Sequence, residues 1–102
     1  MIRHCVFARF RADVPQSERD AIHADLEALR VHLNGMGPVR FGPNVSPEGL
    51  DRGFSAGFTI DFDDAAARDA YLADPAHGRA GARLVAALDG GLDGLLVIDL
   101  DI

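Results

Sequence analysis

The most restrictive feature of the sequence is an alternating segment that runs from Phe54 to Phe62. Every second residue in it is apolar, and the residues between are small or polar. Successive side chains of a strand point to opposite faces of the sheet, so the apolar set shares one face. The segment therefore predicts a strand with a largely aromatic core face, made of Phe54, Ala56, Phe58, Ile60 and Phe62.

Three other segments have the character of strands. Ile2 to Arg11 is rich in Val, Phe and Ile and free of Gly and Pro, and Val39 to Gly42 predicts a short second strand. Gly94 to Ile102 predicts the last strand. In this strand Leu95 and Val97 point to one face of the sheet, and a second apolar set points to the other face: Leu96, Ile98, Leu100 and Ile102. In the first strand Cys5 and Phe7 likewise point to the face opposite that of Val6. Apolar residues thus occupy both faces of both strands, so we expect both faces of the sheet to be at least partly covered.

One long helix is predicted between the first two strands, from Ser17 to Leu33. Ser17 with Asp20 resembles a weak capping box, and Gly35 follows the last apolar position, where a left-handed residue ends many helices. The helix is indicated by apolar residues at helical spacing: Ile22, Leu26, Leu29 and Leu33.

A second helical region follows the alternating strand. Asp63 or Asp64 is a suitable N-cap for a helix that runs to about residue 73. The Asp74-Pro75 pair interrupts it, because the residue before a proline avoids the helical conformation. A new helix then begins with Asp74 as its N-cap and Pro75 in its first turn, and it continues to about residue 88.

The resulting β-α-β-β-α-β order predicts a ferredoxin-like α+β fold with a four-stranded antiparallel sheet. Both helices then lie on one side of the sheet, and one apolar set of the first and last strands must face away from them. Such an exposed face favours association, and a two-fold homodimer through the sheet would cover it. The segment from Gly42 to Gly53 shows no hydrophobic periodicity, so it is predicted to be a long loop. Loops of this length are uncommon unless they have a function.

Composition restricts the partners and the compartment. The chain has 102 residues, a net charge of −6 and no basic stripe, so we expect one domain that binds no nucleic acid. The longest apolar runs are far shorter than the roughly 20 residues of a membrane span, and the N-terminus lacks a secretory signal. A single cysteine, Cys5, permits no internal disulfide. These features predict a cytoplasmic protein without a membrane partner.

Several segments together resemble the stress-responsive A/B barrel (Dabb) family. They span nearly the whole chain: Met1-Ile2-Arg3-His4, the loop from Gly42 to Gly49, Arg52-Gly53-Phe54, Tyr71 to His77, and Leu96 to Leu100. The Tyr-x-x-x-Pro-Ala-His run and the opening histidine are the most specific elements. The resemblance implies a ferredoxin-like protomer that dimerises into an α+β barrel.

The same resemblance implies candidate site residues. One plant branch of the family cyclises a linear polyketide by aldol condensation, without metal or cofactor, using a histidine and a tyrosine. These match His77 and Tyr71, and a pocket-lining histidine of the first strand matches His4. The sequence departs from that branch at Ala56 and Asp74, where the plant cyclase has histidines, which puts its particular substrate in doubt.

Each candidate also has a purely structural interpretation. His77 in the first turn of a helix would stay neutral and could act as a general base, or it could simply pack at the helix–sheet edge. Tyr71 could stabilise a developing oxyanion or serve as a core aromatic, and His4 could line a pocket or be a buried core residue. His23 and His32 fall on different helix faces, so no metal site is expected, and Cys5 reads as a small buried residue.

The sequence thus predicts a small-molecule-binding dimer whose pocket lies between the helices and the sheet. His4, Tyr71 and His77 would supply its polarity, with no cofactor. The alternative is a cofactor-independent enzyme with His77 as base and Tyr71 as oxyanion stabiliser, performing aldol-type chemistry or, less favoured, a cofactor-free monooxygenation. The expected apolar lining is Phe54, Phe58, Ile60, Val6 and Ala8.

Overall fold

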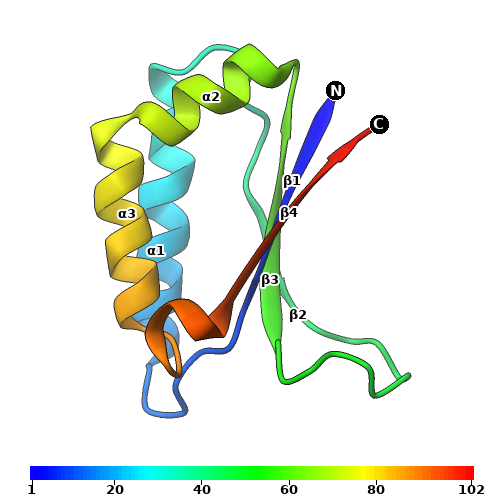
Figure 1. The fold of residues 1–102 in the computed structure, drawn as a ribbon. Coiled ribbons are helices and arrows are strands. Elements are labelled where there is room, and N and C mark those ends of the chain that lie inside the picture. Colours follow the sequence, from blue (N-terminus) through cyan, green and yellow to red (C-terminus); the bar gives the residue numbers. More distant parts are fainter.

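The structure, a computed structural model, describes every residue from Met1 to Ile102. The strands and helices follow one another in the predicted order, with two short 3-10 helices added (Figure 1). The elements are β1 (Ile2–Ala8), α1 (Gln16–Glu27), η1 (Ala28–Val31), β2 (Arg40–Pro43), β3 (Ala56–Phe62), α2 (Ala65–Ala73), α3 (Pro75–Ala86), η2 (Gly91–Gly94) and β4 (Leu95–Asp101).

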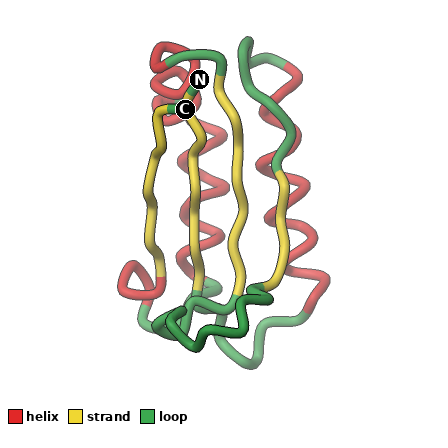
Figure 2. The backbone as a smooth tube through the Cα atoms, turned by 90° about the vertical axis from the view of Figure 1, so that its right-hand side faces the viewer, coloured by secondary structure: helices red, strands yellow, loops and turns green.

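The four strands form one antiparallel sheet in the order β2-β3-β1-β4. Figure 1 shows all three helices on one side of this sheet, and Figure 2 shows the strands side by side in front of the helices. The predicted ferredoxin-like α+β fold is therefore confirmed. We call the side of the sheet that carries the helices the inner face and the other side the outer face.

The alternating segment forms β3, but it begins at Ala56 rather than Phe54. Ala56, Phe58, Ile60 and Phe62 are all buried in the core, as the pattern predicts. Phe54 is not part of this face: its ring lies 4.9 Å from the Arg9 guanidinium, at the base of the long loop. The first strand also ends early, at Ala8, and Phe10 beyond it forms an isolated bridge with Leu88.

Side-chain caps fix the start of both C-terminal helices. Asp64 accepts a 2.8 Å hydrogen bond from the backbone N–H of Ala67 and begins α2. Asp74 accepts a hydrogen bond of the same length from the backbone N–H of Ala76 and begins α3. Pro75 occupies the first turn of α3, where a backbone N–H has no partner within the helix, so its missing N–H costs no hydrogen bond. Two helices therefore meet at Asp74, as the sequence predicts.

The predicted capping box of α1 is wrong. The helix begins at Gln16, Pro15 is its extended N-cap, and no side chain caps it. Asp20 instead accepts a 2.9 Å hydrogen bond from Gln16 within the first turn. Gly35 does have a left-handed backbone, with φ of 75°, but it lies in the turn after η1 rather than directly at the end of α1.

The outer face carries an exposed apolar row from β4. Leu96, Ile98 and Leu100 are 41%, 45% and 48% exposed, and Phe7 beside them is 36% exposed. On the β3 side the same face is polar, and Arg3 donates to both carboxylate oxygens of Asp61 at 2.8 and 3.0 Å. One apolar set thus faces away from the helices, as expected. No helix has the length and apolar character required to cross a membrane.

The long loop forms an arm, residues 44–53, which projects from the outer side of the sheet (Figure 1). Hydrogen bonds tie its two sides together near its base. Asn44 donates to Asp51 across the arm at 2.9 Å, and its backbone N–H donates to Ser55 at 2.8 Å. Asp51 also accepts a 2.8 Å bond from the N–H of Gly53. The arm is therefore a braced structure even though it is exposed.

Candidate functional site

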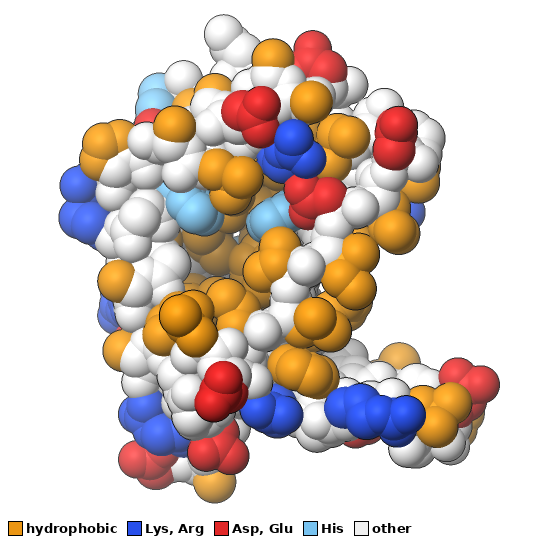
Figure 3. Space-filling view, viewed as in Figure 1, with side chains coloured by type: hydrophobic (Ala, Val, Ile, Leu, Met, Phe, Trp, Pro, Cys, Tyr) orange, Lys and Arg blue, Asp and Glu red, His pale blue; other side chains and the backbone are white.

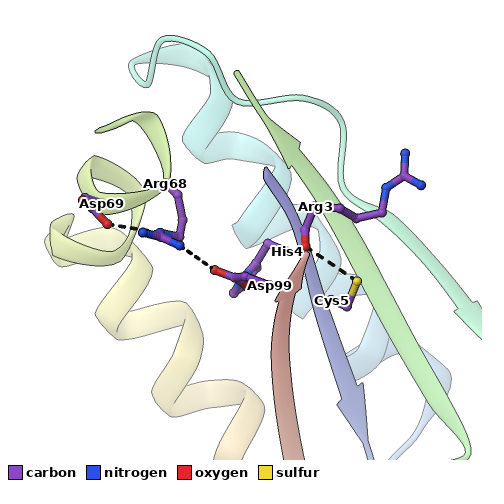
Figure 4. A network of polar contacts seen from close by, with 6 residues as sticks. All are labelled: Arg3, His4, Cys5, Arg68, Asp69 and Asp99. Atoms are coloured by element: carbon purple, nitrogen blue, oxygen red, sulfur yellow. Dashed lines mark hydrogen bonds and ion pairs between the residues drawn. The ribbon is translucent and has the colours of Figure 1, made fainter. Parts of the chain in front are cut away.

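The centre of the candidate site is a pair formed by His4 and Asp99 (Figure 4). The two residues face each other across β1 and β4, and Nδ1 of His4 lies 2.7 Å from Oδ1 of Asp99. His4 is only 4% exposed. The second oxygen of Asp99 accepts a 3.1 Å hydrogen bond from Arg68 on α2, and Arg68 also pairs with Asp69. The carboxylate is thus held from two sides.

This arrangement orients the imidazole of His4. A carboxylate beside Nδ1 favours the proton on that nitrogen and leaves Nε2 as an acceptor, the orientation that a histidine base requires. Burial opposes ionisation of Asp99, but the hydrogen bonds from His4 and Arg68 prevail and lower the pKa of this carboxyl. Asp99 therefore stays ionised near neutral pH.

Tyr71 of α2 stands between the two candidate histidines. Its ring centroid lies 5.7 Å from that of His4 and 4.3 Å from that of His77. The side chain is among the most buried in the chain, at 1% exposure. Burial raises the pKa of the Tyr71 phenol well above its usual value, so the group remains a hydrogen-bond donor.

His77 lies in the first turn of α3 and is half-buried. Burial lowers the pKa of its imidazole, and the neighbouring His4 lowers it further. The neutral form therefore dominates near pH 7, which is the form that accepts a proton. The three predicted residues come from three elements, β1, α2 and α3, and the structure brings them together in one row.

Some polar atoms of this row have no partner within the chain. Nε2 of His4 and the hydroxyl of Tyr71 take part in no hydrogen bond within the chain. Every side-chain nitrogen or oxygen that is fully buried does have a hydrogen-bond partner. Both atoms must therefore retain some accessible surface. Figure 3 shows a hollow between the helices and the sheet, with histidine atoms at its edge and hydrophobic side chains deeper inside.

The residues around this hollow differ from the apolar lining that the sequence predicts. Val6 and Ala8, with Phe58 and Ile60, are fully packed core residues, and Phe54 lies elsewhere, so the prediction that Phe54 lines this pocket is wrong. The opening is on the β4 side instead. Val97 is on the inner face, directly opposite Val6, and is still 49% exposed, because the helices do not reach over this edge strand.

The remaining histidines and the cysteine have structural partners elsewhere. His23 bonds to the carbonyl of Val39 at 2.9 Å, and His32 bonds to Asp74 at 2.7 Å. Cys5 is buried on the outer face, and burial raises the pKa of its thiol. Nowhere do three or more His, Cys, Asp or Glu side chains converge as a metal site would require.

Sequence reasoning missed Asp99, which lies within the predicted last strand. A signal for it exists, because pairing the first and last strands in antiparallel register with Val6 opposite Val97 places Asp99 opposite His4. The choice among possible registers requires the structure, since both strands are apolar on both faces.

Comparison with known families matches residues 2–102 to the stress-responsive A/B barrel domain. The chain belongs to the Dabb family. A crystal structure of a dimeric ferredoxin-like protein of unknown function from Jannaschia sp. CCS1 is 36% identical, with a TM-score of 0.90 over 99% of this chain and 98% of that one. A search of curated proteins found no match.

Two plant structures extend the comparison. An Arabidopsis thaliana protein is 25% identical, with a TM-score of 0.86 over 100% of this Dabb chain and 95% of its own. The hydroxynitrile lyase from Passiflora edulis is 23% identical, with a TM-score of 0.80 over 99% and 92% of the two chains. At this identity the lyase shares the fold, and the fold by itself does not assign an activity.

Proposed function

We propose that this Dabb protein binds a small, largely apolar molecule in the hollow between its helices and its sheet. The observation that carries the proposal is the row of His4, Tyr71 and His77, with ring centroids 5.7 and 4.3 Å apart at the edge of an apolar interior. A few convergent polar groups in an apolar recess are typical of small-molecule sites.

The polar atoms define the chemistry of the ligand. Tyr71 presents a hydroxyl that stays protonated, and His4 presents an Nε2 acceptor oriented by Asp99. A ligand that carries a carbonyl, to accept from the phenol, and a hydroxyl, to donate to the imidazole, would satisfy both atoms. We therefore infer a partly apolar carbonyl compound.

The second candidate is a cofactor-independent enzyme acting on the same class of compound. Its support is the lowered pKa of His77, which keeps a neutral base beside the protonated Tyr71. His77 would accept a proton from the carbon next to a carbonyl, and Tyr71 would donate a hydrogen bond to the enolate oxygen. The enolate carbon would attack a second carbonyl of the same molecule, and the proton of His77 would pass to the new alkoxide.

We also infer that the protein forms a homodimer through the outer face. The exposed row of Leu96, Ile98 and Leu100 supports this, as does the dimeric state of the Jannaschia relative. An apolar surface of this kind is unfavourable in water and favourable in an interface. Light scattering after size exclusion at micromolar concentration tests it, and a monomer would contradict it.

A thermal-shift screen of small carbonyl compounds tests the binding proposal. A true ligand should raise the Tm of the wild type and lose most of that effect in His77→Ala and Tyr71→Phe. His23→Gln serves as the matched control, because His23 bonds to a backbone carbonyl outside the site. A ligand that stabilises all four proteins equally would contradict the proposed site. Turnover that survives both site substitutions would contradict the enzymatic candidate.

A further inference from the structure

A second cavity lies between α1 and β2, at the opposite edge of the sheet from the opening of the hollow. It measures about 250 Å³ and shares no lining residue with the row of rings described above. Val39, just before β2, holds α1 in place there: its carbonyl bonds to His23 at 2.9 Å, and its N–H donates to Glu27 at 2.8 Å. The volume is below the roughly 300–1,000 Å³ of sites for drug-sized ligands, so its occupant must be small.

Arg19 brings an unpaired positive charge to this cavity. The other half-buried arginines have polar partners, because Arg9 donates to backbone carbonyls and Arg68 pairs with carboxylates. The guanidinium of Arg19 instead lies 4.4 Å from the centroid of the Phe10 ring and takes part in no hydrogen bond or ion pair. Removing a guanidinium from water is costly unless it finds a partner. A carboxylate fits it best, since two N–H groups can donate to two oxygens.

Asp20 and His23 bring hydrogen-bond acceptors to the same cavity. Gln16 donates to Oδ1 of Asp20 at 2.9 Å, and Oδ2 of Asp20 accepts nothing within the chain. Nε2 of His23 donates to the carbonyl of Val39, because a carbonyl oxygen can only accept. Nδ1 of the neutral ring therefore carries a free lone pair. The cavity thus combines a cation with an anion, and its formal charges cancel.

The sheet supplies the apolar part of the cavity. Phe41 and Pro43 lie on the inner face of β2, and Pro43 is paired with Ala56 of β3. The half-buried ring of Phe41 stacks on Phe58, with centroids 5.3 Å apart, and lies 5.6 Å from the His23 ring. These neighbours hold the Phe41 ring in place before any ligand binds, so little conformational entropy is lost on binding.

The chemistry of these groups selects among classes of small ligand. A simple carboxylate would satisfy Arg19 but would bring its charge close to that of Asp20. An amine would satisfy Asp20 and leave Arg19 unpaired. A free amino acid carries its carboxylate and its ammonium group on one carbon atom, so it can satisfy both residues at once. An apolar side chain on the same carbon would then contact Phe41.

We propose that this cavity binds a free α-amino acid with an apolar side chain. Arg19 donates to the carboxylate, Asp20 and Nδ1 of His23 accept from the ammonium group, and Phe41 packs against the side chain. The site goes beyond the function proposed for the hollow, and either site can exist without the other.

L-Phenylalanine and two analogues that each lack one charge test the ligand class. 3-Phenylpropanoate has no ammonium group, and 2-phenylethylamine has no carboxylate. NMR titration should give L-phenylalanine a Kd about tenfold or more below that of either analogue, because each analogue leaves a charged group of the cavity unpaired. An analogue that binds as tightly as L-phenylalanine would overturn the ligand class. No binding of L-phenylalanine, L-leucine or L-methionine at millimolar concentration would overturn the site.

Two substitutions assign the two charges. Arg19→Gln should weaken binding of both L-phenylalanine and 3-phenylpropanoate about tenfold or more, whereas Asp20→Asn should weaken L-phenylalanine alone. Arg79→Gln is the matched control, because Arg79 is exposed on α3 and lies outside the cavity. Binding unaffected by Arg19→Gln would contradict the proposal. Circular dichroism checks the fold, and if Arg19→Gln does not fold, the exposed Asp20 decides through the same two compounds.

His77→Ala distinguishes this site from the hollow. Its affinity for L-phenylalanine should equal that of the wild type, and the amide shifts caused by the ligand should lie in α1 and β2. Loss of binding in His77→Ala would place the amino acid in the hollow, which would overturn the second site and leave the first proposal standing. Loss of the carbonyl-compound response with retention of L-phenylalanine binding would support two separate sites.

Discussion

His4 and Asp99 are 95 residues apart in the sequence and 2.7 Å apart in the fold. Their contact joins the first strand to the last, and Arg68 extends it to α2. The pair therefore belongs both to the framework of the sheet and to the candidate site.

Replacing Asp99 should affect stability. Asp99→Asn removes the charge that His4 and Arg68 both contact, and we expect the free energy of unfolding to fall by about 1–3 kcal/mol. Asp101→Asn, on the same strand but exposed, should change it by less than about 0.5 kcal/mol. Urea unfolding measures both, and equal effects would contradict a structural role for the pair.

Protonation of His77 should destabilise the fold. Its pKa is lowered in the folded state, so below the ordinary value of about 6.5 the unfolded chain binds more protons than the folded one. Stability should therefore decrease as the pH falls through this window toward the folded pKa. Urea unfolding between about pH 7 and pH 5 should show a smaller decrease in His77→Gln. NMR titration should give His77 a pKa below 6.5, and a value above it would contradict the prediction.

The ring and the hydroxyl of Tyr71 should contribute very differently. Tyr71→Phe keeps the ring that packs against His4 and His77, and it removes a hydroxyl without a partner, so we expect a loss below about 1 kcal/mol. Tyr71→Ala should cost about 3–5 kcal/mol because it leaves a cavity in the core. A Tyr71→Phe variant as unstable as Tyr71→Ala would show that the hydroxyl has a structural partner.

Asp74 should be a more important cap than Asp64. Both accept a backbone hydrogen bond at a helix start, but the second oxygen of Asp74 also bonds to His32 at 2.7 Å. The hydrogen bond to His32 has the larger effect on the pKa of Asp74, and together with the bond from Ala76 it lowers this pKa. Asp64→Ala should cost about 1 kcal/mol of stability and Asp74→Ala up to about 2.

A double-mutant cycle separates the two contributions of Asp74. His32 is half exposed, so its coupling to Asp74 should be small, at most about 1 kcal/mol. Thermal or urea unfolding of His32→Ala, Asp74→Ala and the double variant measures it. Perfect additivity would show that the His32 contact contributes nothing.

Much of the fold follows from local chemistry that the sequence displays. The Asp74-Pro75 pair marks the junction of α2 and α3, and Asp64 caps as its position suggests, because both effects operate within one turn of chain. The start of α1 was not predictable from Ser17 and Asp20, because Pro15 holds the preceding backbone extended and the helix begins directly after it.

Local sequence patterns predict only part of the candidate site. Phe54 continues the alternation of β3 in sequence, yet Arg9 packs over its ring and holds it at the base of the arm. Tyr71 and His77 were identified by a motif on adjoining helices, whereas Asp99 depends on the register of two strands at opposite ends of the chain. Tertiary pairing of this kind leaves no periodic trace.

The three rings of His4, Tyr71 and His77 come from β1, α2 and α3. Asp99, which bonds to His4, comes from a fourth element, β4. No fragment of the polypeptide can reproduce this row, and local opening of α2 alone would dismantle it. A ligand of this site should consequently bind only the fully folded protein. A tightly bound compound would therefore stabilise the native state and slow proteolysis of the entire chain.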